Sequence, residues 1–364
     1  MAKNTYGKKV RYAVVGLGHF AQEAVLPAFK HAPNSELVAV VSGDPHKKAK
    51  VPRQYKVPFI VGYDEYDDFL ATGEVDAVYI VLPNHLHADY TIRAAKAGVH
   101  VLCEKPLAVT VDECKRMIAA CKKAGVKLMT AYRLHFEENN LSTIEHVQKG
   151  RIGEPRMFAS TFAMDLREGN IREKPVPGRG PLYDIGTYCI NAARGLFRDE
   201  PEEVFMMPAQ GVDQTACVLK FPGGRLATFA VSFDAFHGSR FELIGTKGAI
   251  EADPAFSHKG DLSHTLTVGE KTQEKTAKDR DQIAPEIIYF SDCILKNREP
   301  EPSGYEGLLD VRVIEALKKS ARERHPVRLP RARKRARPSM RQERRARPHR
   351  REPKLVKVAS PSKK

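Results

Sequence analysis

Near the N-terminus, the residues best suited to bind a ligand are small and are predicted to form a turn. Gly16, Gly18 and Ala21 follow an apolar run and precede a helix-like pattern. A strand, a tight glycine turn and a helix N-terminus together hold the pyrophosphate of a dinucleotide, because the helix offers free N–H groups to the phosphates. An ordinary strand-to-helix turn is the alternative. We interpret the turn as a nicotinamide-cofactor site, with candidate contacts at Gly16, Gly18, His19 and Phe20.

The end of the second apolar run, residues 36–41, indicates which cofactor fits. An NAD site usually places an acidic side chain about 20 residues after the glycines, where it accepts a hydrogen bond from the ribose 2′-OH. Here Ser42 stands at the strand end and Lys47 follows within a turn, which suits the 2′-phosphate of NADP. We expect NADP rather than NAD. Lys47 also fits a solvated helix start, and Asp44 also fits a contact with the ribose diol.

Two further polar groups directly follow apolar runs, where ligands of parallel sheets bind. Pro83, Asn84 and His87 follow one such run, and the pair Glu104 and Lys105 follows the next. A charged pair directly after an apolar strand is an odd choice for packing alone. Its simpler interpretation is a surface ion pair at a strand end.

A third candidate group lies in the middle of the chain. Asp184 and Tyr188 are four residues apart, so they share one face of a helix predicted over residues 184–194. From the residues alone, Asp184 also fits a charge that complements the N-terminus of a helix. Tyr188 also fits a half-buried core aromatic.

The order and spacing of these motifs resemble those of the Gfo/Idh/MocA oxidoreductases, and within that family the glucose-fructose oxidoreductase branch. The similarity covers about residues 9–330. The segments that carry it are Gly16-x-Gly18-x-x-Ala21, Val41-Ser42-Gly43, Ala77–Asn84 with His87, Glu104-Lys105-Pro106, Tyr132-Arg133-x-His135, Tyr183-Asp184-Ile185-Gly186-x-Tyr188 and Tyr305–Pro326.

The resemblance implies a Rossmann domain and NADP-dependent hydride transfer to or from a sugar, either an aldose or a related polyol or ketose. It implies that Lys105 donates to the reacting oxygen, that Tyr188 exchanges the hydroxyl proton and that Asp184 orients the sugar. Arg133 is a further candidate for cofactor or substrate contact. Most family members have His at the position of Tyr188, and the loop at residues 178–182 reads Gly-Arg-Gly-Pro-Leu instead of Gly-Gly-Gly.

The elements that position the first groups alternate between strand and helix. Short apolar strands separated by helical stretches indicate a doubly wound parallel sheet, which we assign to a dinucleotide-binding Rossmann domain over residues 1–133. The helices end at Gly98 and Gly125. The predicted strands are 12–15, 36–41, 76–82, 99–103 and 127–131, and the predicted helices are 85–97 and 111–124.

Residues 134–330 are predicted to form an α/β domain for substrate binding and oligomerisation. A helix-like stretch, 138–149, is followed by β-rich runs with hairpin signals between them. The predicted strands are 157–164, 216–221, 226–233 and 240–244. Short turns between strands indicate a large, mostly antiparallel open sheet. The resemblance implies that this sheet pairs with its copy in a homodimer or homotetramer.

Composition limits the remaining possibilities. A chain of 364 residues can hold two cores, and it has neither an apolar run of membrane-spanning length nor the apolar segment of a secretory signal. Six scattered cysteines predict free thiols in the cytoplasm. We expect no metal site, because His85, His87, His100, His135 and His146 lack ligand spacing.

The net charge of +15 is concentrated at the C-terminal end. Residues 331–364 hold fifteen Lys or Arg and two acidic residues, and the rest of the chain has a net charge of +2. This segment has few large apolar residues and several prolines, so we predict a disordered basic tail. Weak, salt-sensitive and nonspecific binding of polyanions such as nucleic acid is one alternative role. A catalytically silent regulator that senses a sugar or the cofactor is another interpretation of the whole chain.

Overall fold

The computed structural model of the protein describes residues 9–170, 172, 175–208, 214–332, 336–349 and 352–362. The contacts divide the chain into two compact units. Unit 1 comprises Met1–Arg133, Asp281–Leu308 and Arg344–Ser360, and unit 2 comprises Leu134–Arg280, Leu309–Glu343 and Pro361–Lys364. Each unit therefore combines segments that are far apart in the sequence, whereas the sequence interpretation assigned consecutive domains.

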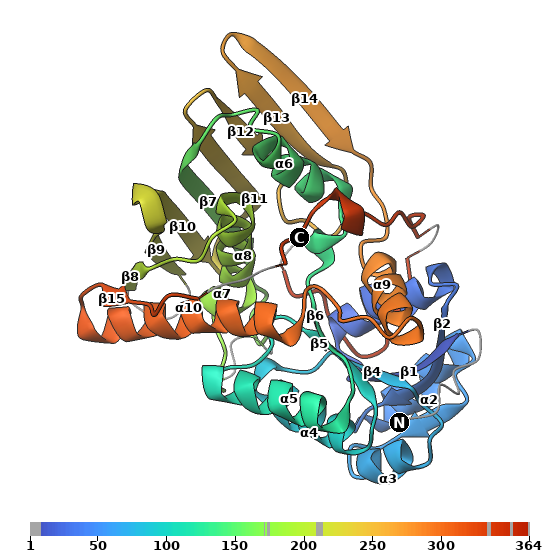
Figure 1. Ribbon diagram of the computed structural model, residues 1–364. Helices are drawn as coiled ribbons and strands as arrows, with labels where there is room; N and C mark the ends of the chain where they lie inside the picture. Colours follow the sequence, from blue (N-terminus) through green and yellow to red (C-terminus); the bar gives the residue numbers. More distant parts are fainter. Residues whose placement is uncertain are drawn as a thin grey trace. The chain divides into compact units, whose positions relative to one another are not determined.

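Unit 1 is built on a sheet that contains six parallel strands among the described residues, in the order β3-β2-β1-β4-β5-β6 (Figure 1). The bounds are β1 (Val10–Val15), β2 (Ser35–Val41), β3 (Phe59–Val61), β4 (Ala77–Ile80), β5 (His100–Glu104) and β6 (Leu128–Ala131). The predicted parallel sheet is confirmed. The short edge strand β3 was missed, and its middle residue, Ile60, is 44% exposed. Strand order reverses between β1 and β4, the position where such sheets bind ligands.

The helices of unit 1 begin and end where local capping favours it. Thr110 and Glu113 form a capping box at the start of α5, and Gly125 ends that helix with a φ of 69°. The bounds are η1 (Ala21–Val25), α1 (Leu26–Ala28), η2 (Phe29–His31), α2 (Pro45–Tyr55), α3 (Tyr66–Ala71), η3 (Asn84–Leu86), α4 (His87–Lys96), α5 (Val111–Ala124) and α9 (Ala284–Leu295), with η4 (Arg133–His135) at the boundary.

Helix α9 completes unit 1 although it follows the strands by about 150 residues. It contacts β1 and β2, and Figure 1 shows it in orange beside them. The hydroxyl of Ser291 lies 2.8 Å from the hydroxyl of Tyr12 in β1 and 2.8 Å from that of Ser35 in β2. Because Tyr12 and Ser291 are fully buried, these bonds satisfy polar groups that would otherwise lose their water without compensation.

Unit 2 is built on a sheet with nine described strands, in the order β14-β13-β12-β11-β7-β10-β9-β8-β15. Neighbouring strands are antiparallel except β7 and β10, which confirms the predicted mostly antiparallel sheet. The strands beyond the four predicted ones were missed. The bounds are β7 (Pro155–Asp165), β8 (Glu203–Pro208), β9 (Gln214–Lys220), β10 (Leu226–Ser232), β11 (Asp234–Gly245), β12 (Gly248–Ala252), β13 (Leu262–Val268), β14 (Lys271–Ala277) and β15 (Val327–Arg328).

Helices contact one face of this sheet, and the other face keeps apolar side chains exposed. The helices α6 (Glu138–Gln148), α7 (Pro181–Asp184) and α8 (Gly186–Phe197) contact its strands. Phe236, in the irregular start of β11, is 94% exposed, and the other exposed large apolar residues on these strands are Met157, Met207, Val218, Leu226 and Ile244. Alternation along a strand places them on the face opposite the buried residues. Helix α10 (Gly304–Glu323) and the short turns η6 (Pro222–Gly224) and η7 (Met340–Gln342) complete the described helices.

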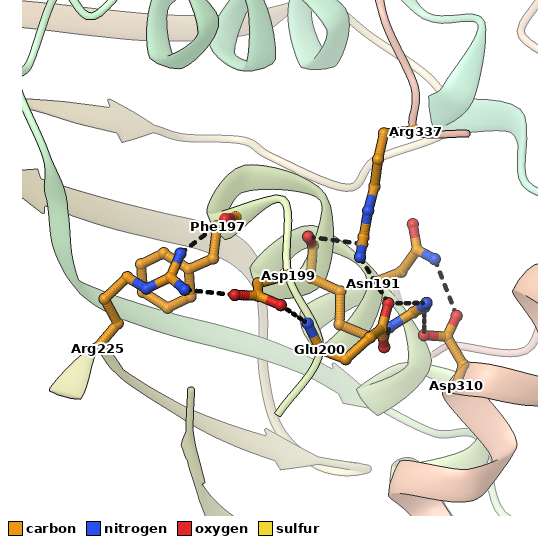
Figure 2. Close-up of polar contacts among 8 residues, drawn as sticks. Asn191, Phe197, Asp199, Glu200, Arg225, Asp310 and Arg337 are labelled. Carbon is orange, nitrogen blue, oxygen red and sulfur yellow. Dashed lines mark hydrogen bonds and ion pairs between the residues drawn. The ribbon is translucent and has the colours of Figure 1, made fainter. Parts of the chain in front are cut away.

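The segment after residue 330 makes specific contacts in its described part, which corrects the prediction of a disordered tail. In unit 2, Arg337 is nearly buried and donates to the carboxylate of Glu200 at 2.8 Å and to the carbonyl of Arg194 at 3.1 Å (Figure 2). Arg194 in turn binds Glu200 at 2.7 Å and also contacts Asp310. This segment packs through charge pairing, which a lack of large apolar residues does not exclude.

The next part of the segment packs on unit 1. The ring of His349 stacks on that of His31 with centroids 4.8 Å apart, and its Nε2 lies 3.2 Å from Oδ2 of Asp281. The backbone of Val356 both donates to and accepts from the side-chain amide of Gln22, at 2.7 and 3.0 Å. Residues 333–335, 350–351 and 363–364 of the predicted tail lie outside the described residues. Within the described ranges, no helix combines the length and the apolar character needed to cross a bilayer.

Candidate functional site

The turn after β1 is close-packed at one glycine and open at the other. A Cβ added at Gly16 would lie 2.4 Å from the carbonyl oxygen of Val81, and Gly16 has a φ of 100°, so only glycine fits there. A Cβ added at Gly18 would meet no atom within 4 Å, so its backbone is open to a ligand. His19 and Phe20 begin the helical run, and Nδ1 of His19 lies 3.4 Å from a carboxylate oxygen of Glu23. The turn therefore fits a dinucleotide.

The loop after β2 is organised by Asp44. Its Oδ1 accepts from the backbone N–H groups of His46 and Lys47 at the start of α2, at 2.9 and 3.2 Å. Its Oδ2 lies 2.9 Å from the ammonium of Lys357, and this bond holds the pKa of Asp44 below its usual value. The hydroxyl of the buried Ser42 accepts from the Asp44 N–H at 3.2 Å. Burial lowers the pKa of Lys47, and Asp44 opposes that shift.

His87 joins the loops that follow β4 and β5. It is fully buried, with Nδ1 2.9 Å from the carbonyl of Pro106 and Nε2 2.8 Å from the carbonyl of Leu82. Burial lowers its pKa, which disfavours the doubly protonated ring. Pro83 and Asn84 lie between these contacts, where η3 begins. His87 thus fixes the relative position of two predicted cofactor loops.

The Glu104–Lys105 pair is backed by a second carboxyl that sequence reasoning missed. The hydroxyl of Tyr79 lies 2.8 Å from Oε1 of Glu104 and 2.7 Å from Oε1 of Glu286 in α9. One hydroxyl has one proton to donate, so Tyr79 can satisfy only one of these two carboxyl oxygens at a time. Burial raises the pKa of Glu286, and the charge of Glu104 adds to that effect. Burial also raises the pKa of Glu104, against the influence of Lys105.

Arg133 lies on the same side of unit 1 as these carboxyls. It is 5% exposed, and its guanidinium donates to the side-chain oxygen of Gln282. Its charge lowers the pKa of both Glu104 and Glu286, which partly offsets their burial. No local sequence pattern predicts a role for Glu286 or Gln282 at this site, because both belong to a segment that returns to unit 1 late in the chain.

Asp184 ends one short helix, which corrects the prediction of a single helix over residues 184–194. Helix α7 ends at Asp184, Ile185 caps both helices, and α8 carries Tyr188. The carboxylate of Asp184 lies 2.5 Å from Nε of Arg172, an ion-pair partner that no sequence signal indicated. This pair fixes the carboxylate and leaves part of it exposed, at 22%.

Tyr188 packs among aromatic rings in unit 2. Its ring centroid is 5.7 Å from that of Phe162 at a steep angle, and 5.9 Å from that of Phe256 in a stacked arrangement. The ring is half-buried, so aromatic packing orients the phenol while part of it stays accessible. Lys105 belongs to unit 1, whereas Asp184 and Tyr188 belong to unit 2.

One group of described residues has the side chains to hold a metal ion, although we expected no metal site. It consists of His31, Asp281 and His349, whose ligand atoms lie within 4.8 Å of one another. In the structure both rings contact Oδ2 of Asp281, at 2.9 and 3.2 Å, and Oδ1 accepts from the backbone at the start of α9. Hydrogen bonding thus accounts for the group without an ion. Its members are too far apart in sequence to form a recognisable spacing.

Comparison with known proteins identifies relatives over most of the chain. A model of an oxidoreductase family with an NAD-binding Rossmann fold matches residues 10–132, and a model of the GFO/IDH/MocA C-terminal domain matches residues 141–251. A D-xylose 1-dehydrogenase [NADP(+)] from Haloarcula marismortui is 31% identical, over 88% of this chain and 93% of that one. An uncharacterized oxidoreductase from Rhizobium meliloti is 36% identical, over 86% and 97%.

Solved structures agree with these matches. The aldose-aldose oxidoreductase from Caulobacter crescentus, solved with glycerol, superposes with a TM-score of 0.84 at 36% identity, covering 88% of this chain and all of that one. A 3-ketoreductase from Actinomadura kijaniata, solved with NADP and TDP-benzene, gives 0.79 at 26% identity, covering 86% and 98%.

Proposed function

Because this chain belongs to the GFO/IDH/MocA family of oxidoreductases, we propose that it transfers hydride between a sugar and NADP(H). Lys105, Tyr188 and Asp184 are its catalytic residues in this proposal. The observation that carries it is the placement of Lys105 directly after Glu104, at the carboxyl end of β5. The same unit holds a glycine turn that is open at Gly18. The substrate class is an aldose, or a related polyol or ketose.

NADP is the proposed cofactor for two reasons. The loop after β2 carries Ser42 and Lys47, and both oxygens of Asp44, the one acid between them, already have partners. In addition, a relative is a D-xylose 1-dehydrogenase named for NADP(+), and the related 3-ketoreductase was solved with NADP. The residues that would hold the cofactor are Gly16, Gly18, His19, Phe20, Ser42, Lys47, Pro83, Asn84, His87, Glu104, Lys105 and Arg133.

The chemistry assigned to the chain is proton transfer and orientation. Bound NADP+ supplies a hydride acceptor for a sugar carbon. The Lys105 ammonium donates to the oxygen on that carbon and favours its anionic form. The phenolate form of Tyr188 takes up the proton of that oxygen when the sugar is oxidised, and the phenol returns it in the reverse direction. Asp184, fixed by Arg172, accepts hydrogen bonds from the other sugar hydroxyls.

The proposal is tested by turnover on a panel of aldoses and polyols, followed through the absorbance of reduced cofactor. Lys105→Ala and Tyr188→Phe should each lower turnover on the best sugar about 10²–10⁴-fold, with an unchanged melting temperature. Lys115→Ala, at an exposed position of α5, is the matched control. Wild-type turnover in the Tyr188→Phe variant would remove that residue from the proton step. Tight NADP+ binding by a wild-type protein that oxidises no sugar would favour a sensing regulator.

We also propose that the exposed face of the nine-stranded sheet joins copies of this chain as a homodimer or homotetramer. Met157 lies opposite Leu226 on one neighbouring strand and opposite Ile244 on the other, so three exposed apolar side chains are adjacent. Such a cluster favours association. Ile244→Glu should shift the mass measured by light scattering toward the monomer, whereas Lys271→Glu in β14 should not. An unchanged mass for Ile244→Glu would place the interface elsewhere.

A cytoplasmic location is the last part of the proposal. All six cysteines are free and buried, and burial raises the pKa of Cys121 and of Cys189 to about 12. Such thiols are protonated and unreactive at neutral pH, which suits a reducing compartment. Thiol titration should find six reactive groups only after unfolding. Disulfides in protein isolated without reductant would contradict this location.

A further inference from the structure

The C-terminal segment lies beside two of the loops that we assign to the cofactor in unit 1, the glycine turn after β1 and the loop after β2. The side-chain amide of Gln22 is nearly buried, donates to the carbonyl of Leu17 at 3.0 Å and exchanges two hydrogen bonds with the backbone of Val356. Leu17 lies between the two glycines of the first turn. The side chain of Gln22 therefore links the backbone of Val356 to that turn.

The next residue, Lys357, points its ammonium at the loop after β2. Its Nζ lies 2.9 Å from Oδ2 of Asp44, the residue that caps α2. Lys357 has a φ of 52°, in the left-handed region that is unfavourable for a residue with a Cβ. Glycine or asparagine would adopt this conformation more readily, so the backbone geometry does not explain the choice of lysine. A role for the positive charge of the side chain explains the choice of lysine.

The charge of Lys357 changes the electrostatic balance of the loop. Without it, Asp44 and Lys47 would cancel, and the carboxylate would repel an incoming phosphate. With it, a second ammonium joins this loop, because Nζ of Lys357 lies 2.9 Å from the Asp44 carboxylate. Burial lowers the pKa of Lys47, and the positive charge of Lys357 adds to that effect. The hydroxyl of Ser42 accepts from the backbone N–H of the same Asp44. Two ammonium groups and a hydroxyl at one loop form a donor set that suits a phosphate dianion.

We propose that Lys357 determines NADP specificity: with Lys47 and Ser42 it forms a binding site for the 2′-phosphate, so the C-terminal segment supplies part of the cofactor site. Lys357 donates to the phosphate while it keeps Asp44 neutralised, because an ammonium has three N–H donors. The carboxylate of Asp44 is thereby withheld from the ribose diol that an NAD site would bind. This inference rests on the proposed use of NADP.

The test compares equilibrium binding of NADP+, NAD+ and 2′,5′-ADP, measured by calorimetry or fluorescence without any substrate. Lys357→Asn removes the cation and keeps a residue that tolerates the left-handed backbone. It should weaken binding of NADP+ and of 2′,5′-ADP about 10-fold or more, and NAD+ binding less than 2-fold. Lys354→Asn, an exposed lysine of the same segment, is the matched control and should change none of the three.

The outcomes separate this inference from the function that it extends. If wild-type protein binds NADP+ no more tightly than NAD+, the proposed cofactor choice fails. If wild type prefers NADP+ and Lys357→Asn keeps the same ratio, only the role of Lys357 fails. Equal weakening of both cofactors would also overturn it, because it would mean that the residue supports the loop and does not contact the phosphate. If adding Asp44→Asn to the Lys357→Asn variant restores NADP+ binding, then Lys357 acts only by neutralising Asp44. That result would contradict a direct contact between Lys357 and the phosphate.

Discussion

Gly16 and Gly18 belong to one turn but have different surroundings, which predicts opposite results for the same substitution. Gly16→Ala places a Cβ against the Val81 carbonyl in a left-handed backbone, so it should lower the free energy of unfolding by roughly 1–3 kcal/mol or more. Gly18→Ala meets no atom, so it should unfold like wild type and lose NADP+ affinity. Melting curves with and without NADP+ distinguish the two. A destabilised Gly18→Ala variant would contradict the open turn.

The shared proton site at Glu104 and Glu286 predicts a pH dependence of stability. Because the pKa of Glu286 is raised in the folded state, its stabilising contribution is complete below the unfolded value of about 4.3 and is lost as pH rises through the folded pKa. Glu286→Gln is neutral at every pH, so it removes this loss. The melting temperature of Glu286→Gln minus that of wild type should increase from pH 5 to pH 9. A difference that decreases with pH would mean that Glu286 is ionised when folded.

The sequence reveals only some of these site residues because local signals mark only some of them. Lys105 and Asn84 follow apolar runs, and the glycines follow the first strand, so strand ends alone locate them. Glu286 and Arg172 have no such marker. Glu286 is an acid within an amphipathic helix, and Arg172 precedes α7, so their contacts depend on tertiary packing. Sequence spacing carries no information on packing of that kind.

At the scale of elements, the C-terminal segment is a structural part of both units. Arg337→Met removes one of the two guanidinium groups that are seen to bind the buried Glu200, so it should lower the free energy of unfolding by about 2–4 kcal/mol. Arg331→Met, at an exposed position of the same segment, should change it by less than 0.5 kcal/mol. Chemical denaturation of both variants provides the measurement. Equal free energies of unfolding for Arg337→Met and wild type would mean that the segment does not stabilise the folded units.

Element prediction succeeded where a single pattern determined the structure. Helix α5 has the predicted bounds, because Thr110 and Gly125 mark its ends. The edge strand β14 was missed since its sequence, Lys-Thr-Gln-Glu-Lys-Thr-Ala, has almost no apolar face and pairs with β13 mainly through its backbone. The C-terminal segment was misjudged for a similar reason. Ion pairs and backbone bonds fix it, and apolar periodicity does not detect either.

At the scale of the whole molecule, unit 1 depends on a segment that returns from far along the chain. A fragment of residues 1–133 lacks α9, so the buried Tyr12 hydroxyl loses its partner and the faces of β1 and β2 are uncovered. We expect that fragment to lack a cooperative thermal transition. Joining residues 281–308 to it through a short flexible linker should restore one, because Arg133 and Gln282 already contact each other. Cooperative melting of 1–133 alone would contradict this dependence.

Because α9 comes late in the sequence, it also determines when the sheet of unit 1 is covered during synthesis. About 150 residues separate Arg133 from Asp281. At about 5–20 residues per second, roughly 7–30 s pass between translation of the last strand of this sheet and translation of the helix that covers it. During that time the emerging chain presents unfinished apolar surface to chaperones and to neighbouring nascent chains. Arrested chains that stop before residue 281 should therefore be cut by protease within residues 1–133, and those with α9 outside the ribosome should resist.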